Sequence, residues 1–130
     1  MTTAGELLQY MSYPTLLDHL TDDVEWHLPD SLWEGVGGAH IGRPAVEKML
    51  DKVMTEFYDP KTMTPEVKAA FGTETHATMI FTMNAITRWG QPYINNYAIT
   101  IEAKNGKIAK VHEVFDTKNL FDTLDNSKLG

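Results

Sequence analysis

The sequence of 130 residues has no cysteine, no long apolar run and an excess of acidic over basic side chains. The absence of cysteine excludes disulfide bonds, thiolate nucleophiles and cysteine-ligated metal sites. No apolar run approaches the roughly 20 residues that a membrane-spanning helix needs. The 18 acidic and 11 basic residues give a net charge of −7, which opposes binding to phosphate backbones. We therefore expect neither a membrane protein nor a nucleic-acid-binding protein.

Targeting signals and linkers are absent as well. The N-terminal stretch MTTAGELLQY contains no basic segment followed by an apolar one, so we expect no secretory signal and a cytoplasmic protein. The length and the ordinary globular composition indicate that residues 1–130 form a single domain. The end of the chain, about residues 122–130, is expected to fray.

Several catalytic motifs are also missing. HExxH and carboxylate-triad patterns do not occur, and the 5 histidines do not pair with another ligand on one predicted face. We therefore predict no metal and no cofactor. No GxSxG occurs, which argues against an acyl-enzyme mechanism. The glycines of residues 35–42 match neither GxGxxG nor the P-loop, and we interpret this run as the flexible rim of a pocket.

Hydrophobic periodicity predicts the order of the elements. Helical spacing predicts an interrupted helix and a long one, and alternation predicts strands. The order predicts an α+β domain, whose curved sheet wraps the long helix and leaves a pocket at its open end. The predicted helices cover residues 3–20 and 44–58, and the predicted strands cover residues 22–28, 64–73, 75–89, 93–103 and 107–116, with a loop at residues 30–42.

The two last strands form the most informative stretch, YINNYAITIEAKNGKIAKVHEVFDTK. They flank Asn105 and Gly106, a pair that tolerates positive φ and is typical of tight hairpins. Side chains alternate between the faces of a strand. One face of the second strand is therefore apolar except at Glu113; it carries Ala109, Val111, Glu113 and Phe115.

Glu113 is the first candidate for catalysis, because a carboxyl among core-facing residues is unusual. Desolvation raises the pKa of a carboxyl group, and a raised pKa suits a general acid or base near neutral pH. The alternative is a structural role, in which Glu113 pairs with Arg88 or Lys110 or reaches solvent at the strand edge.

Tyr97 and Asn95 lie on the inward face of the preceding strand. A tyrosine hydroxyl and an amide can orient water or polarise a carbonyl, although Tyr97 can equally be a core aromatic and Asn95 a buried amide with a structural partner. Large apolar side chains are expected to line the pocket, with Trp33 as a lid. The predicted lining is Trp26, Trp33, Met49, Val53, Phe71, Met79 and Phe81.

Two stretches resemble a known family. NGKIAKVHEVFDT resembles the closing hairpin of the SnoaL-like branch of the NTF2-like superfamily, which includes ketosteroid isomerase, polyketide cyclases and limonene-epoxide hydrolase. DDVEWHLPDSLWEGVGGAHIGRPAVEKML resembles the family's first strand, tryptophan-containing loop, Gly-Arg turn and following helix. The resemblance spans most of residues 20–120. It implies an NTF2-like cone, in which a curved antiparallel sheet wraps around helices and encloses an apolar pocket.

The sequence departs from these enzymes at their catalytic positions. The position that matches the base of ketosteroid isomerase is Trp26, and the strand that matches its protonated acid offers Tyr97 or Ala98. The stretch IFTMNAI, where the epoxide hydrolase has Arg-x-Asp, contains no charge. Only Glu113 matches a catalytic carboxylate of that hydrolase.

Two functions remain open. The first is a cofactor-free enzyme that acts on a small apolar molecule by general acid/base catalysis, of the isomerase, cyclase, dehydratase or epoxide hydrolase type. The second is a non-catalytic ligand-binding or dimerisation domain. The lost carboxylates favour the second, and Glu113 favours the first, which we prefer. The resemblance also implies a homodimer through the outer sheet face, which would include Thr78, Ile80, Thr82, Ile86, Ala98 and Thr100.

Overall fold

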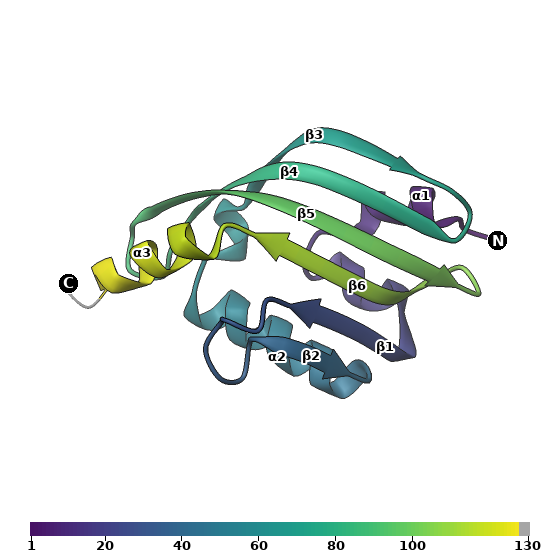
Figure 1. Cartoon of the computed structure of the whole chain (residues 1–130), viewed down its shortest axis with the longest axis horizontal. Helices are drawn as coiled ribbons and strands as arrows, with labels where there is room; N and C mark the ends of the chain where they lie inside the picture. The colour runs from purple at the N-terminus through teal and green to yellow at the C-terminus, as the bar shows by residue number, and fades with distance from the viewer. Residues whose placement is uncertain (128–130) are drawn as a thin grey trace.

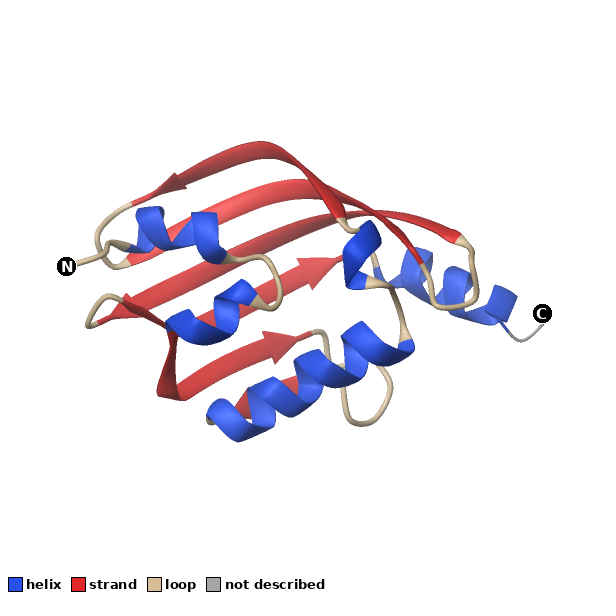
Figure 2. Cartoon of the chain, turned by 180° about the vertical axis from the view of Figure 1, so that it is seen from behind, coloured by secondary structure: helices blue, strands red, loops and turns tan. Residues whose placement is uncertain are grey.

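A computed structural model describes residues 1–127 and shows one curved sheet with helices against its concave face (Figures 1 and 2). The strands of this 6-stranded sheet lie in the order β2-β1-β6-β5-β4-β3. The helices are α1 (Ala4–Leu7), α2 (Arg43–Glu56) and α3 (Thr117–Ser127), with 3₁₀ turns at Leu8–Tyr10, Thr15–His19 and Pro60–Thr62. The strands are β1 (Leu20–Leu28), β2 (Gly38–Ile41), β3 (Thr64–Gly72), β4 (His76–Ile86), β5 (Pro92–Lys104) and β6 (Lys107–Phe115).

The predicted α+β class is confirmed, and one strand pair adds a detail that the sequence did not indicate. Neighbouring strands are antiparallel, except that β1 pairs with β6 in parallel. Parallel neighbours need a long connection, and here α2 and four strands of the same sheet lie between the two along the chain. The sheet is therefore mixed. No helix in residues 1–127 is long and apolar enough to cross a membrane.

The closing hairpin forms as its sequence predicts. Asn105 and Gly106 have φ values of 54° and 75°, the positive values that a tight turn between β5 and β6 requires. One expectation is wrong at the base of the hairpin. A register shift opposite Glu102 and Ala103 leaves Ala109 of β6 without a partner and buries Ile108, whereas simple alternation places Ala109 on the inner face.

Helix α2 packs against strand β1, and both follow their predicted patterns. The buried face of β1 consists of Val24, Trp26 and Leu28, which alternate. Pro44 lies in the first turn of α2, where its missing N–H costs nothing. Apolar side chains at helical spacing then pack against the sheet; those buried are Val46, Met49, Leu50 and Met54.

Two segments differ from their predicted structure. Within the predicted loop at residues 30–42, Gly38–Ile41 forms β2, an edge strand that pairs with β1. Glycines before and after this short segment suggest a loop, and the strand forms because it pairs with β1. The helix α3 after β6 continues to Ser127 and buries Leu120 against the core, so helical structure extends into the stretch from about residue 122 that was expected to fray. The rest of the predicted frayed tail, residues 128–130, lies outside the described residues.

Arg43 ties the N-terminal segment to α2. Its Nη2 donates to the backbone oxygen of Leu17 at 2.7 Å and its Nη1 to that of Leu20 at 3.3 Å. Its Nε donates to Glu47 at 2.7 Å. Hydrogen bonds from a charged donor are stronger than neutral ones. One side chain therefore holds the turn before β1 in place over the helix.

We predict that Arg43→Met lowers the free energy of unfolding by about 1.5–3 kcal/mol, because two backbone carbonyls lose a charged donor. Urea denaturation measures the change. Lys52→Met is the control, since the Lys52–Glu56 ion pair of 3.0 Å on the same helix is exposed and should contribute less than about 1 kcal/mol. Equal effects of the two substitutions would contradict the assigned role of Arg43.

Candidate functional site

A cavity of about 100 Å³ lies between α2 and the concave face of the sheet. Its walls come from the N-terminal turns, β1, the loop after β1, α2, β4, β5, β6 and α3. Among the described residues that line it, Glu113 is the only charged type, and the rest are apolar apart from tyrosine hydroxyls and tryptophan N–H groups. The predicted apolar pocket is therefore present, and its polarity is concentrated at a few atoms.

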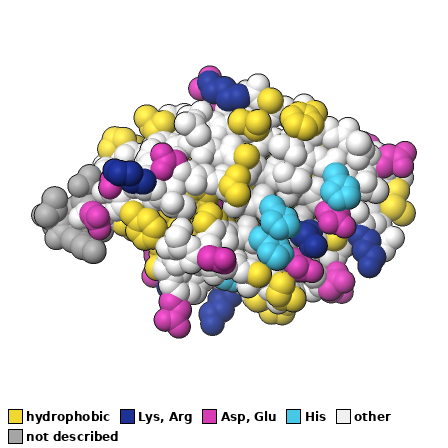
Figure 3. Space-filling view, viewed as in Figure 1, with side chains coloured by type: hydrophobic (Ala, Val, Ile, Leu, Met, Phe, Trp, Pro, Cys, Tyr) yellow, Lys and Arg dark blue, Asp and Glu magenta, His cyan; other side chains and the backbone are white. Residues whose placement is uncertain are grey.

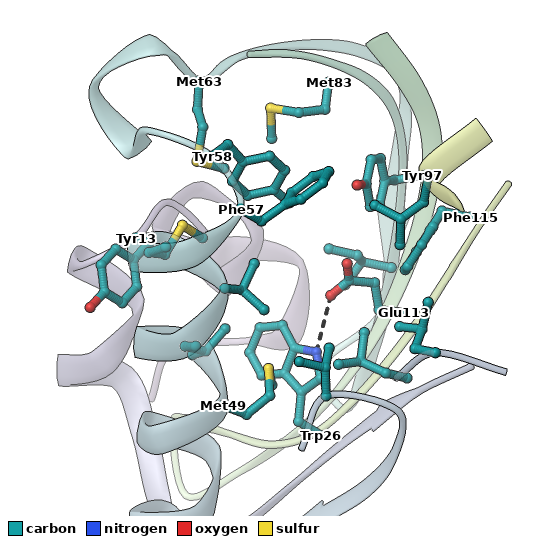
Figure 4. A pocket seen from close by; sticks show the side chains of 18 of the residues that line it. Tyr13, Trp26, Met49, Phe57, Tyr58, Met63, Met83, Tyr97, Glu113 and Phe115 are labelled. Carbon is teal, nitrogen blue, oxygen red and sulfur yellow. Dashed lines mark hydrogen bonds between the residues drawn. The ribbon is translucent and has the colours of Figure 1, made fainter. Parts of the chain in front are cut away.

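Glu113 projects from β6 into this cavity, with Tyr97 on one side and Trp26 on the other (Figure 4). The indole Nε1 of Trp26 donates a hydrogen bond of 3.0 Å to its Oε1. Burial raises the pKa of Glu113 to about 7, and the bond from Trp26 offsets a smaller part of this rise. The partial exposure of Glu113 reflects surface that faces the cavity.

The ion pairs considered for Glu113 do not form. Arg88 instead donates to the backbone oxygen of Met54. Lys110 lies on the opposite face of β6, where it borders a groove with His112. Among the described residues, Glu113 has no cation within ion-pair distance. The carboxyl therefore changes charge near neutral pH, so that it can both give and take a proton there.

A chain of polar groups lies beside Glu113 on β5. The Nδ2 of Asn95 lies 2.7 Å from the Tyr93 hydroxyl, and the Tyr93 and Tyr97 hydroxyls lie 2.7 Å apart. The Tyr97 ring lies against Phe81 and Phe115, with centroid distances of 5.3 and 4.8 Å. These contacts hold the Tyr97 hydroxyl at the cavity wall.

Burial keeps the tyrosine hydroxyls of this region protonated. It raises the pKa of Tyr93 to about 12 and that of Tyr97 well above the ordinary value of 10.0. The pKa of Tyr58, which also lines the cavity, rises for the same reason and because the charge of Glu113 is near. At neutral pH these groups are hydrogen-bond donors and not bases.

Most of the predicted site residues lie at the cavity. Glu113 and Tyr97 are at its wall. Asn95 is not; it lies behind Tyr93, where it also donates to the backbone oxygen of Asp116 at 2.9 Å. Five of the predicted lining residues do line the cavity: Trp26, Trp33, Met49, Val53 and Phe81.

Two predicted lining residues lie elsewhere. Phe71 is 62% exposed on the edge strand β3, because a register shift between Val67 and Ala69 interrupts the alternation on which its inward position was based. Met79 packs against the core without lining the cavity. Both positions depend on local irregularity and sheet curvature, which alternation alone does not describe.

Sequence reasoning missed Tyr58 and Tyr93. Tyr58 follows the end of α2, and no periodic pattern indicates where its side chain points. Tyr93 could have been found, since it shares a strand face with Asn95 and Tyr97 by simple alternation. Tyr58 lines the cavity and Tyr93 does not. The other missed wall residues are Tyr13 and several apolar side chains, which include Met54, Phe57, Met63, Met83 and Leu120.

The histidines lie outside the cavity. His27 and His112 stack on the outer face of the sheet, with ring centroids 4.4 Å apart, and His27 lies 3.0 Å from Glu25. As expected, His112 and Glu113 point to opposite faces. Within residues 1–127, no group of three or more His, Asp or Glu side chains is placed to hold a metal ion.

No known family model matches the sequence, and no curated protein sequence matches it either. Solved structures do match. An NTF2-like protein of unknown function from Burkholderia pseudomallei is 20% identical, with a TM-score of 0.73 over 92% of this chain and 89% of that one. An NTF2-like protein from Burkholderia thailandensis is 14% identical, with a TM-score of 0.75 over 95% and 98% of the two chains.

A third similar structure is that of TerC co-crystallised with polyporic acid. It is 20% identical, with a TM-score of 0.71 over 83% of this chain and 82% of that one. At sequence identities this low, structural similarity indicates a shared fold but not a shared function. The chain therefore has the NTF2-like fold that its sequence implied, while its assignment to the SnoaL-like branch stays a prediction.

We predict that Glu113 makes stability depend on pH. Its pKa is about 7 in the folded chain and ordinarily 4.5, so folding favours the protonated form. The stability of the wild type should fall as pH rises from about 4.5 to 7 and then level off, a loss of about 3 kcal/mol. Glu113→Gln should remove this dependence and be the more stable protein at pH above 7. Parallel urea-denaturation profiles of the two proteins across this range would contradict the assignment.

Proposed function

We propose that the protein is a cofactor-free enzyme that acts on a small apolar molecule by general acid/base catalysis at Glu113. The observation that carries the proposal is a carboxyl with a pKa of about 7 inside an apolar cavity, without a cationic partner in residues 1–127. Such a group is a poor structural element, because burying it costs free energy. It is a suitable acid and base near neutral pH.

The two oxygens of Glu113 have different surroundings. Oε1 accepts the hydrogen bond from Trp26, which leaves Oε2 for the substrate. The ionised carboxyl would remove a proton from carbon or from water, and the protonated form would return it. A tyrosine hydroxyl near Tyr97 in the cavity wall would donate a hydrogen bond that stabilises negative charge on a substrate oxygen.

The size of the cavity limits the part of the substrate that it can bury. Its volume of about 100 Å³ is below the roughly 150 Å³ of an engineered cavity that binds benzene. We therefore propose that at most one ring of the substrate enters, and that the reaction is an isomerisation, cyclisation, dehydration or epoxide hydrolysis of the SnoaL-like kind. The polyporic acid present with the similar TerC structure supports a small organic ligand.

The second candidate is a non-catalytic domain that binds a small ligand in the same cavity. The observation in its favour is the position of Trp26, which stands where ketosteroid isomerase has its base and here donates to Glu113. In that case the Trp26–Glu113 pair would be a polar anchor for the ligand. Binding without turnover would distinguish this function from the first.

We also propose a homodimer that forms through the outer face of the sheet. This face carries exposed hydrophobic side chains over β3 to β6 (Figure 3). Ile80, Ala98 and Val114 form a continuous row across β4, β5 and β6, and Val114 is 59% exposed. Apolar surface of this kind is costly in water, and a second copy of the same face would cover it.

For the catalytic proposal we expect Glu113→Gln to lower kcat by about 10²–10⁴-fold in a screen of small enolisable ketones and epoxides. Because the carboxylate is the base, kcat/KM of the wild type should rise with pH and level off above about 7. Glu102→Gln is the matched control, since Glu102 lies on the outer face near His76. Ligand binding with no turnover of any compound would favour the binding domain instead.

For the dimer we expect the wild type to sediment as a dimer at micromolar concentration. Ile80→Lys and Val114→Lys should each give a monomer, because a charge at the centre of the apolar row is desolvated on association. Ile41→Lys on β2, where Ile41 is 61% exposed, should leave the dimer intact. A monomeric wild type in analytical ultracentrifugation would rule out the proposed assembly.

A further inference from the structure

The neighbours of Asn95 fix the orientation of its side-chain amide. Asn95 is 2% exposed. One end of the amide lies 2.9 Å from the backbone oxygen of Asp116, and the other end lies 2.8 Å from the backbone nitrogen of Asn96. A carbonyl oxygen only accepts and a backbone N–H only donates, so the end that faces Asp116 must be the nitrogen. The same nitrogen lies 2.7 Å from the Tyr93 hydroxyl oxygen and therefore donates to it.

The direction of the next bond follows from counting protons. A tyrosine hydroxyl has one proton, and Tyr93 lies 2.7 Å from the Tyr97 hydroxyl. If Tyr97 donated to Tyr93, the buried proton of Tyr93 would have no acceptor among the described contacts, which is unfavourable. Tyr93 therefore accepts from Asn95 and donates to Tyr97.

This series of hydrogen bonds ends at the cavity with a hydroxyl proton that has no acceptor within the series. Tyr97 accepts from Tyr93, so its own proton points away from Tyr93. Tyr58 and Tyr97 both line the cavity. Once Tyr97 accepts from Tyr93, its own proton has no acceptor among the described hydrogen bonds and is available to a ligand in the cavity.

We propose that Asn95 is a positioning residue, which sets the direction of the Asn95–Tyr93–Tyr97 chain so that its cavity end is always a hydrogen-bond donor. The inference rests on the proposed function and narrows its substrates to compact molecules with an acceptor oxygen, such as the carbonyl of a ketone or quinone. That oxygen binds at the donor end, and the proton that Glu113 transfers belongs to the same molecule. Asn95 itself touches no substrate.

Asn95→Asp is designed to reverse the chain without changing its shape. The oxygen that replaces Nδ2 carries at most one proton, and the carbonyl of Asp116 takes that proton. Tyr93 must then donate to the new carboxyl group, and Tyr97 to Tyr93, so that the cavity end loses a donor. Asn96→Asp is the matched control, because the Asn96 side chain lies on the outer face and accepts from Thr82 at 2.8 Å.

The probe is cyclohexanone labelled with ¹³C at the carbonyl, and the readouts are its C=O stretching frequency when bound and its Kd. Both are measured well below pH 7, where Glu113, with its pKa of about 7, is protonated in every variant. In Asn95→Asp we expect a higher frequency and an affinity that falls by roughly 2- to 10-fold, the equivalent of one lost neutral hydrogen bond. Asn96→Asp should change neither.

A second variant keeps the test decisive if Asn95→Asp does not fold. Tyr93→Phe removes the middle of the chain and retains Tyr97, so it should raise the frequency in the same direction by a smaller amount, because cooperative polarisation of the Tyr97 hydroxyl is lost. If cyclohexanone binds and its frequency is the same in the wild type and in these variants, the inference is overturned and the proposed function stands. If cyclohexanone does not bind the wild type at millimolar concentration, both are overturned.

Discussion

The parallel pairing of β1 with β6 is the contact on which the site depends. It sets Trp26 beside Val111 in register, and from there the indole N–H reaches Oε1 of Glu113. This bond provides the carboxyl with its one hydrogen-bond partner among the described residues. A buried polar group without any partner is costly. The register of two strands that are distant in sequence therefore decides that a carboxyl can be held at this position at all.

The polar groups in the cavity wall and directly behind it divide into one that titrates near neutral pH and others that do not. Burial raises the pKa of Glu113 toward neutrality and moves the pKa values of Tyr93 and Tyr97 further from it. The same desolvation thus has opposite consequences, since it disfavours the charged form of each group. One group changes its charge, while the others remain donors in constant positions. This is the preorganisation that acid/base chemistry on a neutral substrate needs, and it is obtained at the expense of stability.

The sequence alone predicted much of this arrangement, because its signals are local. Alternation placed Glu113 and Tyr97 on the inner face, Asn-Gly marked the hairpin, and helical spacing marked α2. What it could not predict depends on contacts between distant segments: the strand β2, which forms only against β1, and the bond from Trp26 to Glu113. The position of Phe71 failed because a register shift in β3 turns the side chain outward. Alternation assumes a regular strand, and curved sheets contain such irregularities.

The parallel pair also affects the order in which the molecule can be made. Trp26 and Glu113 are 87 residues apart, so a ribosome that adds about 5–20 residues per second needs roughly 4 to 17 s between them. During this time β2 and α2 are already available to pair with β1 and to cover it, but the strand that pairs with its other edge has not been made. The cavity has no carboxyl and no far wall until β6 emerges. The nascent chain therefore exposes the edge of β1 as an open pairing surface for several seconds, and only the last strand of the sheet closes it.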